Sequence, residues 1–166
     1  MDEEEQFREI PEFRLYAVSN LGRVLHTRFN RIMIQTPQQY GDMTVGLTKN
    51  GAQHRRSVKR LVAQAWVNGR SLHCDSVINK DGDRSNNHYM NLAWRPRWFA
   101  WKYHQQFENI PSWAMSGPIH EVIHEQIYET FVDAMMYNGE LLSDIRQSIA
   151  TQGRVFPTGN LYRYYK

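Results

Sequence analysis

The sequence predicts an α+β fold for this chain of 166 residues. Short runs of alternating apolar and polar residues, separated by turn signals such as Asn50-Gly51, indicate β-hairpins in the first half of the chain. Apolar residues spaced three and four positions apart over 58–66 indicate an amphipathic helix. With 41% hydrophobic and 13% aromatic residues, the chain has enough apolar material to bury a core.

Composition excludes several classes of protein. The single cysteine, Cys74, excludes a disulfide framework and a zinc site built from paired cysteines. No apolar run approaches the length that spans a membrane, and the acidic first residues lack the apolar core of a signal peptide. We therefore expect a soluble, cytoplasmic protein.

The net charge of +3 is unevenly distributed. Residues 49–74 contain six basic residues and no acid, namely Lys49, Arg55, Arg56, Lys59, Arg60 and Arg70. Residues 107–145 contain no Lys or Arg, and their acids are Glu108, Glu121, Glu125, Glu129, Asp133, Glu140 and Asp144. The first segment suits phosphates as partners, whereas the second suits a basic protein surface.

The N-terminal elements are predicted to be two strands around a turn. Val18 ends the first strand, Ser19–Gly22 form the turn and Val24 opens the second strand. Arg23 beside this turn can reach a phosphate or remain a solvated charge, and the residues leave both interpretations open.

Further hairpins are predicted over 31–58, followed by the helix that begins near Val58. The cations on and just before this helix are Arg55, Arg56, Lys59 and Arg60. Because no acid neighbours them in the sequence, they are predicted to contact phosphates.

Residues 76–105 predict a strand at Val77-Ile78, a turn at Asp81-Gly82, a strand over 92–94 and a helix whose first turn holds Pro96. The tryptophans Trp94, Trp98 and Trp101 recur at helical spacing. Such a stripe favours a place in the core over a platform for stacking bases.

Pro111 and Gly117-Pro118 predict a connector over 107–126. Beyond it, Thr130 is placed to cap a helix, and Asn138-Gly139 predicts a turn into a second helix. The apolar faces of the two helices are Phe131, Ala134 and Met135, and then Leu141, Leu142, Ile145 and Ile149.

Three stretches make the chain similar to the HNH homing endonucleases of phages and introns. Residues 16–24 keep the pattern Tyr-x-Val-Ser-Asn-x-Gly-Arg-Val of a module that precedes the nuclease in that family. The nuclease hairpin keeps its scaffold residues Asp81, Gly82, Asp83, Asn86, Asn87, Asn91, Leu92 and Trp94. Residues 127–166 resemble a helix-turn-helix repeat, with 159–164 as its closing aromatic strand.

The resemblance implies a β-rich nuclease-associated module with a helix over 1–70 and an HNH-like ββα unit over 71–106. The connector 107–126 and a helix-turn-helix module over 127–166 would follow. Double-stranded DNA would be the substrate. A family member would use Mg²⁺ or Mn²⁺.

The chemical positions of that family are altered. The general-base His falls on Asn79, the first metal ligand on Ile78 and the helix Asn on Ala100. Asparagine has no group that titrates near neutral pH, and Ile and Ala offer a hard cation no oxygen. We therefore expect no catalytic residue, no metal and no cofactor, with His73, His88 and His104 as the possible substitutes.

The residues predicted to contact DNA are Arg23, Arg55, Arg56, Lys59, Arg60, Lys80, Arg84, Arg95, Arg97, Lys102, Arg146 and Gln147. Arg146 and Gln147 lie on the second C-terminal helix, where a recognition helix would meet the major groove. Glu140 and Asp144 beside them are expected to oppose phosphates.

Three functions compete. The chain is a catalytically inactive relative that binds DNA, an active nicking nuclease with a rewired site, or a repurposed regulator or inhibitor that binds a host or phage protein through 107–150. The basic residues favour DNA binding, the altered chemical positions disfavour cleavage, and the acidic segment favours a protein partner.

Overall fold

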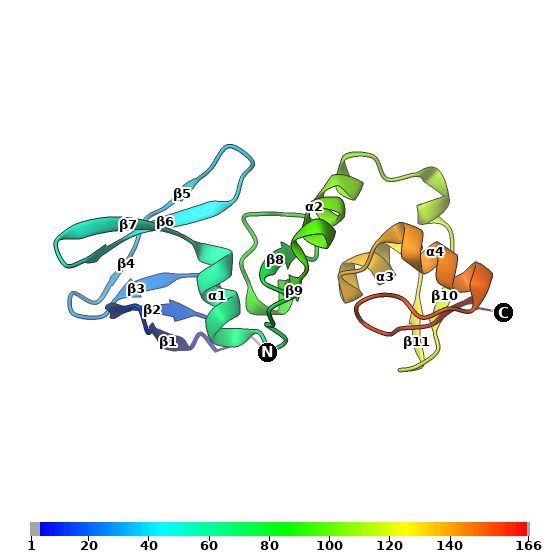
Figure 1. Cartoon of the computed structure of the whole chain (residues 1–166), viewed down its shortest axis with the longest axis horizontal. Helices are drawn as coiled ribbons and strands as arrows, with labels where there is room; N and C mark the ends of the chain where they lie inside the picture. The colour runs from blue at the N-terminus through cyan, green and yellow to red at the C-terminus, as the bar shows by residue number, and fades with distance from the viewer. Residues whose placement is uncertain (1–3, 166) are drawn as a thin grey trace. The chain divides into compact units, whose positions relative to one another are not determined.

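The computed structural model describes residues 4–165, which divide into two compact units (Figure 1). The first unit holds the residues up to Asn79 and Asp83–Trp94. The second holds Lys80–Gly82 and the chain from Arg95 onward. The segment 71–106, expected to form one ββα unit, therefore contributes its strands to the first unit and its helix to the second.

Two antiparallel sheets build most of the first unit. Their strands are β1 (Phe7–Ile10), β2 (Phe13–Ser19), β3 (Val24–His26) and β4 (Arg31–Ile32), and then β5 (Gln35–Pro37), β6 (Met43–Lys49) and β7 (Ala52–Ser57). Each sheet keeps its strands in chain order. The β6–β7 turn has Asn50 and Gly51 at φ 53° and 77°, both left-handed, so the predicted hairpin is confirmed.

Helix α1 (Val58–Trp66) follows β7 directly, as the apolar spacing predicts. Its buried residues are Val58, Leu61, Val62 and Ala63. A two-stranded sheet, β8 (Ser76–Asn79) with β9 (Leu92–Arg95), completes the unit, and the short helix η1 (Tyr89–Asn91) precedes β9.

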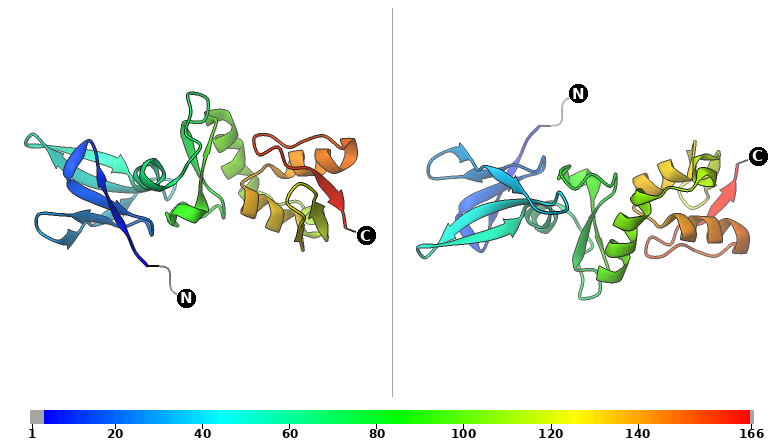
Figure 2. Two further views of the ribbon diagram at one scale, coloured as in Figure 1. Left: turned by 90° about the horizontal axis from the view of Figure 1, so that it is seen from below. Right: turned by 90° about the horizontal axis from the view of Figure 1, so that it is seen from above.

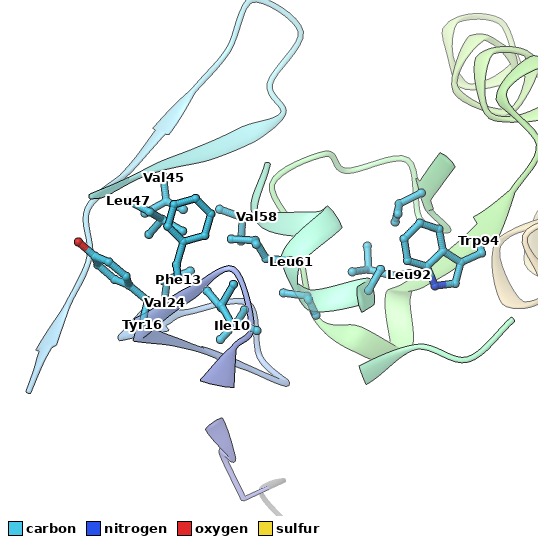
Figure 3. Close-up of a cluster of buried hydrophobic side chains, with 14 residues drawn as sticks. Ile10, Phe13, Tyr16, Val24, Val45, Leu47, Val58, Leu61, Leu92 and Trp94 are labelled. Atoms are coloured by element: carbon cyan, nitrogen blue, oxygen red, sulfur yellow. The ribbon is translucent and has the colours of Figure 1, made fainter. Parts of the chain in front are cut away.

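One apolar core joins the sheets, α1 and the β8–β9 pair of the first unit (Figure 3). Its residues include Ile10, Phe13, Tyr16, Val24, Val45, Leu47, Val58, Leu61, Leu92 and Trp94. Each buried Val, Leu or Phe contributes about 1.5–3 kcal/mol relative to an exposed one. The core holds the N-terminal sheets and the HNH-like hairpin as a single body.

The second unit packs three helices and a small sheet. Its elements are α2 (Arg97–Gln105), η2 (Gln106–Glu108), η3 (Ser112–Met115), β10 (Ile119–Glu121), β11 (Gln126–Tyr128), α3 (Phe131–Asn138), α4 (Leu142–Thr151) and β12 (Tyr162–Tyr164). The sheet order is β11-β10-β12, and two further views of the ribbon appear in Figure 2. The segment expected to be a connector thus supplies the central strand, β10.

The predicted cap of α3 is confirmed. The Thr130 hydroxyl accepts from the Asp133 backbone N–H at 3.1 Å, and the Asp133 carboxylate accepts from the Thr130 N–H at 2.9 Å. Gly139, at φ 64°, ends the helix in a left-handed conformation. The α+β class is as predicted, and none of the helices within 4–165 is long and apolar enough to cross a membrane.

Candidate nucleic-acid interface

Asn79 ties the end of β8 to the loop that follows it. Its side chain has no exposed surface, and its Nδ2 donates to the Asn86 carbonyl at 2.8 Å and to the Asn87 Oδ1 at 3.4 Å. Ile78 beside it is also fully buried. Both side chains therefore serve the packing of the hairpin.

The N-terminal turn is locked onto the same loop. The Asn20 carbonyl accepts from the Tyr89 N–H at 2.8 Å, and the Asn20 side chain accepts from the Gln6 N–H at 2.9 Å. Gly22, at φ 91°, packs so closely that an added Cβ would lie 3.0 Å from the Asn87 Cβ. The two stretches that carry the family pattern thus support one another.

Asp83 shapes the turn after β8. Its carboxylate accepts from the Ser85 hydroxyl at 2.7 Å and from the Ser85 N–H at 2.8 Å. These side-chain and backbone hydrogen bonds hold the pKa of Asp83 below its ordinary value. Asp83 is therefore a turn-forming residue.

Asp42 brings together two predicted DNA-contacting residues that are distant in sequence. Lys59 forms an ion pair with its carboxylate, and Arg84 lies 3.0 Å from it. Burial raises the pKa of Asp42, but the hydrogen bonds and charges of Lys59 and Arg84 outweigh that effect and lower it. One carboxylate thus orients two cations.

Asp75 holds a second pair of cations. Arg60 donates to both of its carboxylate oxygens at 3.0 Å, and Arg70 donates at 3.0 Å to one of them. Hydrogen bonds from Arg60 and then Arg70 lower the pKa of Asp75. Both guanidinium groups also lie over the Trp94 ring, at 5.9 and 5.4 Å.

A hollow of about 730 Å³ lies beside α1 in the first unit. Its charged lining residues are Arg8, Glu9, Glu12, Arg56, Arg60 and Arg70. Four guanidinium groups face these two carboxylates and Asp75, which pairs with Arg60 and Arg70, so this arginine-lined hollow keeps a small positive excess. Arg8 is positioned by its contact with the Trp66 ring at 3.8 Å and its bond to the Ala65 carbonyl at 2.5 Å.

Two further predicted residues have different surroundings in the first unit. Arg23 donates from Nε to Glu5 at 2.8 Å and is exposed. Arg55 on β7 is exposed to solvent, whereas Arg56 beside it is half-buried, 3.8 Å from Glu12 and 5.0 Å from the Phe13 ring.

Arg95 and Lys80 are used within the second unit. The buried guanidinium of Arg95 donates to the carbonyls of Asn138 at 2.8 Å and Gly139 at 3.1 Å, at the C-terminal end of α3. Lys80 donates to the Tyr137 carbonyl at 2.9 Å, and burial lowers its pKa. Lys80 and Arg95 therefore stabilise the C-terminal end of α3. Arg97 and Lys102, by contrast, are exposed to solvent.

The expectation that Glu140 opposes phosphates is wrong. Glu140 has no exposed surface, and its carboxylate accepts from the Tyr162 hydroxyl at 2.6 Å, the Asn160 Nδ2 at 3.0 Å and the Thr158 hydroxyl. Burial raises the pKa of Glu140. This burial could not be predicted from the sequence, because the partners of Glu140 lie about twenty residues further along the chain.

The exposed side of α4 carries the two residues predicted to read bases. Arg146 and Gln147 are both exposed, and the Arg146 guanidinium lies 4.8 Å from the Trp113 ring. Asp144 is half-buried and accepts from the Ser143 hydroxyl at 3.0 Å. One of the two carboxylates expected beside them is therefore absent from this surface.

Parts of the sequence match known proteins. Residues 5–48 match the NUMOD4 motif. Two proteins of Acanthamoeba polyphaga mimivirus, the uncharacterized HNH endonucleases L247 and L245, are 28% identical over 89 residues and 30% identical over 90. Each alignment covers 54% of this chain, but the chain spans only 22% and 26% of those proteins.

A solved structure extends the likeness to the whole fold. It is described as "DNA binding and cleavage by the HNH homing endonuclease I-HmuI", and it matches 96% of this chain and 98% of its own with a TM-score of 0.57 at 22% identity. The chain therefore shares the fold of an HNH homing endonuclease, and part of it is similar in sequence to HNH endonucleases.

The resemblance assigns the chemistry of that family to positions 78, 79 and 100. The side chains of Ile78 and Ala100 carry no donor atom for a cation, and the buried Asn79 donates from Nδ2 to its own loop, while its Oδ1 has no hydrogen-bond partner among the described residues. Across 4–165, no three His, Cys, Asp or Glu side chains gather as metal ligands would. Of the possible substitutes, His88 accepts from the Met90 N–H at 3.2 Å, and His73 is exposed. The third, His104, lies edge-on to the Tyr103 ring.

The expectation that the three tryptophans lie in the core is wrong for Trp98 and Trp101. Trp94 lies on β9 and is buried, but α2 begins only at Arg97, so Trp94 does not share a helix with the others. Trp98 and Trp101 are 54% and 64% exposed. The buried face of α2 consists of Phe99, Ala100 and Tyr103.

Proposed function

We propose that this HNH relative binds double-stranded DNA without cutting it. The observation that carries the proposal is the state of Asn79. A fully buried amide, bonded to the Asn86 carbonyl, stands where the family has its general base. Such a group neither takes a proton from water near neutral pH nor reaches a phosphate.

Binding is supported by the cations of the first unit. The arginine-lined hollow and the neighbouring Arg55 present guanidinium groups, which bind phosphate oxygens in a bidentate manner. The solved relative I-HmuI is described in terms of DNA binding and cleavage. On this proposal the contact residues are Arg23, Arg55, Arg56, Lys59, Arg60, Arg84, Arg97, Lys102, Arg146 and Gln147, without Lys80 and Arg95, which are bonded within the second unit.

The test is the salt dependence of binding to a duplex. Each phosphate contact contributes a slope of about −0.9 to the plot of log K against log salt. Replacing Arg55, Arg56 and Arg60 together by Gln is expected to weaken binding and flatten the slope by about two to three units. Fluorescence anisotropy over a salt series measures both.

A matched control removes as many charges from elsewhere in the same unit. Arg14, Arg28 and Arg31 are exposed and lie outside the lining of the hollow. Replacing these three by Gln is expected to change the slope by less than half as much. An equal effect of both triple variants would mean that only net charge matters, and would contradict a defined contact face.

A protein partner is the second candidate, and its support is smaller than the sequence suggested. Glu140 and Glu121 belong to the acidic segment, yet both are buried and accept hydrogen bonds within the second unit. Binding of a host or phage protein through 107–150 stays a prediction, as do a bacteriophage origin and a cytoplasmic location.

A further inference from the structure

The outward face of α2 presents two large aromatic side chains to solvent. Trp98 and Trp101 are 54% and 64% exposed, while Phe99 and Tyr103 on the other side are fully buried. Residues three positions apart are neighbours on a helix surface, so the two indoles share one face. The core of the second unit is filled without them, and their exposure calls for a partner.

Trp98 is held in place by other rings. It stacks on Phe156 with centroids 5.9 Å apart and planes inclined by 19°, and it meets Phe99 edge-on at 5.7 Å. Phe156 is itself 50% exposed and also contacts Phe99, at 6.4 Å. The indole is therefore held by two rings while Trp98 as a residue remains exposed to solvent.

Positive charge frames this aromatic face. The Lys102 Nζ lies 5.5 Å from the Trp98 ring, and Arg97 precedes that residue in the chain. Within the described residues, neither cation lies within ion-pair distance of a carboxylate, and no acid occurs in the sequence from 84 to 107. Aromatic faces beside cations suit a polyanion that carries rings of its own.

We propose that this face, defined by Arg97, Trp98, Trp101, Lys102 and Phe156, binds the unpaired nucleotides of single-stranded DNA. Inside a duplex, neighbouring base pairs cover both faces of each base. An unpaired base is free to stack on an indole. The bases would stack on the two tryptophans and the phosphates would lie against the two cations. The inference rests on DNA being the ligand and adds a preference for its single-stranded form.

The experiment compares single-stranded and duplex DNA with the full chain. Anisotropy titrations use a labelled twenty-nucleotide thymidine strand and a twenty-base-pair duplex. Because each stacked base contributes substantially to binding, the double variant Trp98→Ala, Trp101→Ala is expected to lose about tenfold affinity per indole for the single strand. Its affinity for the duplex should stay within about twofold of that of the unmodified protein.

Two controls separate this proposal from the duplex-binding function. The variant Trp98→Phe, Trp101→Phe keeps aromatic faces and is expected to retain most of the single-strand affinity. The variant with Gln at 55, 56 and 60 should lose duplex binding more than single-strand binding. If single-strand binding depends on the tryptophans while duplex binding is absent, the inference stands and the duplex function fails.

Other outcomes overturn the inference. Equal losses on both DNAs would place the tryptophans in the duplex site, and unchanged single-strand affinity would remove their role altogether. If the Ala variant instead abolishes self-association in sedimentation velocity and leaves DNA binding intact, the face is a protein interface. Circular dichroism checks that both double variants keep the fold, which is expected because the replaced side chains are exposed.

Discussion

Glu140 is an acidic residue whose side chain stabilises the interior of the second unit through hydrogen bonds. Its carboxyl group is fully buried, and it accepts hydrogen bonds from the side chains of Thr158, Asn160 and Tyr162. Through these bonds the start of α4 is joined to β12 and the loop before it. Burying a carboxylate costs free energy even when it is hydrogen-bonded, and this is why burial raises its pKa.

The raised pKa of Glu140 predicts a pH-dependent stability. The folded state holds this proton above the ordinary glutamate pKa of 4.5, whereas the unfolded state releases it. The contribution of Glu140 to the free energy of unfolding is therefore greatest below pH 4.5, and it is lost as the pH rises through the pKa of the folded state. Relative to the unmodified protein, Glu140→Gln should gain stability as pH increases over that window, measured by urea unfolding.

The exposed Glu108 provides the comparison. Glu108→Gln removes one surface carboxyl group and is the control for loss of charge, measured over the same pH range. A flat difference between Glu140→Gln and the unmodified protein across the same pH range would show that the buried carboxyl has an ordinary pKa.

Asn79 gives a second prediction at this scale. Asn79→Ala removes the 2.8 Å hydrogen bond to the Asn86 carbonyl, which keeps the Asn91 Nδ2 as a donor at 2.9 Å, so we expect a loss of about 0.5–1.5 kcal/mol in the free energy of unfolding. The exposed Asn68→Ala should change it by less than about 0.5 kcal/mol. If both substitutions are equally mild in urea denaturation, Asn79 has no scaffold role.

At the scale of elements, the turn between β2 and β3 and the loop before β9 depend on one another through Gly22. Substitution of Gly22 by Ala has two costs: its φ of 91° disfavours any side chain, and the new Cβ would lie 3.0 Å from the Asn87 Cβ. Gly69, at φ 96° with nothing within 4 Å, shares only the first cost.

These two glycines form a matched pair for measurement. Gly69→Ala is expected to cost about 1–3 kcal/mol from backbone strain alone. Gly22→Ala should cost more, because a packed loop must also move. Urea denaturation of the two variants compares them directly, and equal losses would mean that the turn and the loop are not coupled by packing.

Elements decided by local chemistry could be predicted from the sequence. The hairpin at Asn50-Gly51 and the Thr130 cap depend on residues within a few positions, and both are present. Strand β10 was missed because Pro111 and Gly117-Pro118 indicate a connector, and because its second partner, β12, lies near the end of the chain. The exposure of Trp98 was missed because helical spacing does not reveal which side of a helix is buried. In α2 the buried side consists of Phe99, Ala100 and Tyr103.

At the scale of the whole molecule, the candidate site was predicted in part. Sequence located the basic residues around α1, but it could not tell Arg95, bonded to the end of α3, from exposed Arg97. Local sequence gives the charge of a residue, whereas tertiary packing decides whether that charge faces solvent. Arg8 in the hollow had no sequence signal at all.

The absence of cleavage is the prediction for the molecule as a whole. A general base alone contributes roughly 10²–10⁴-fold to a rate; Asn79 supplies no base, and Ile78 and Ala100 supply no metal ligand. Purified protein is expected to leave supercoiled plasmid intact with Mg²⁺ or Mn²⁺, as measured by gel electrophoresis. Nicking that persists through purification and disappears in His88→Ala or His104→Ala would instead establish a relocated catalytic site.

The path of the chain between the units constrains how such proteins can be recombined. Lys80–Gly82 belongs to the second unit, where the Tyr103 hydroxyl donates to the Lys80 carbonyl at 2.5 Å and Phe107 packs against Gly82. The residues on either side of this tripeptide belong to the first unit. A single genetic crossover at Arg95 would transfer the C-terminal helices and leave the tripeptide behind. Exchange of this unit between two such proteins therefore requires two separate segments that fit each other.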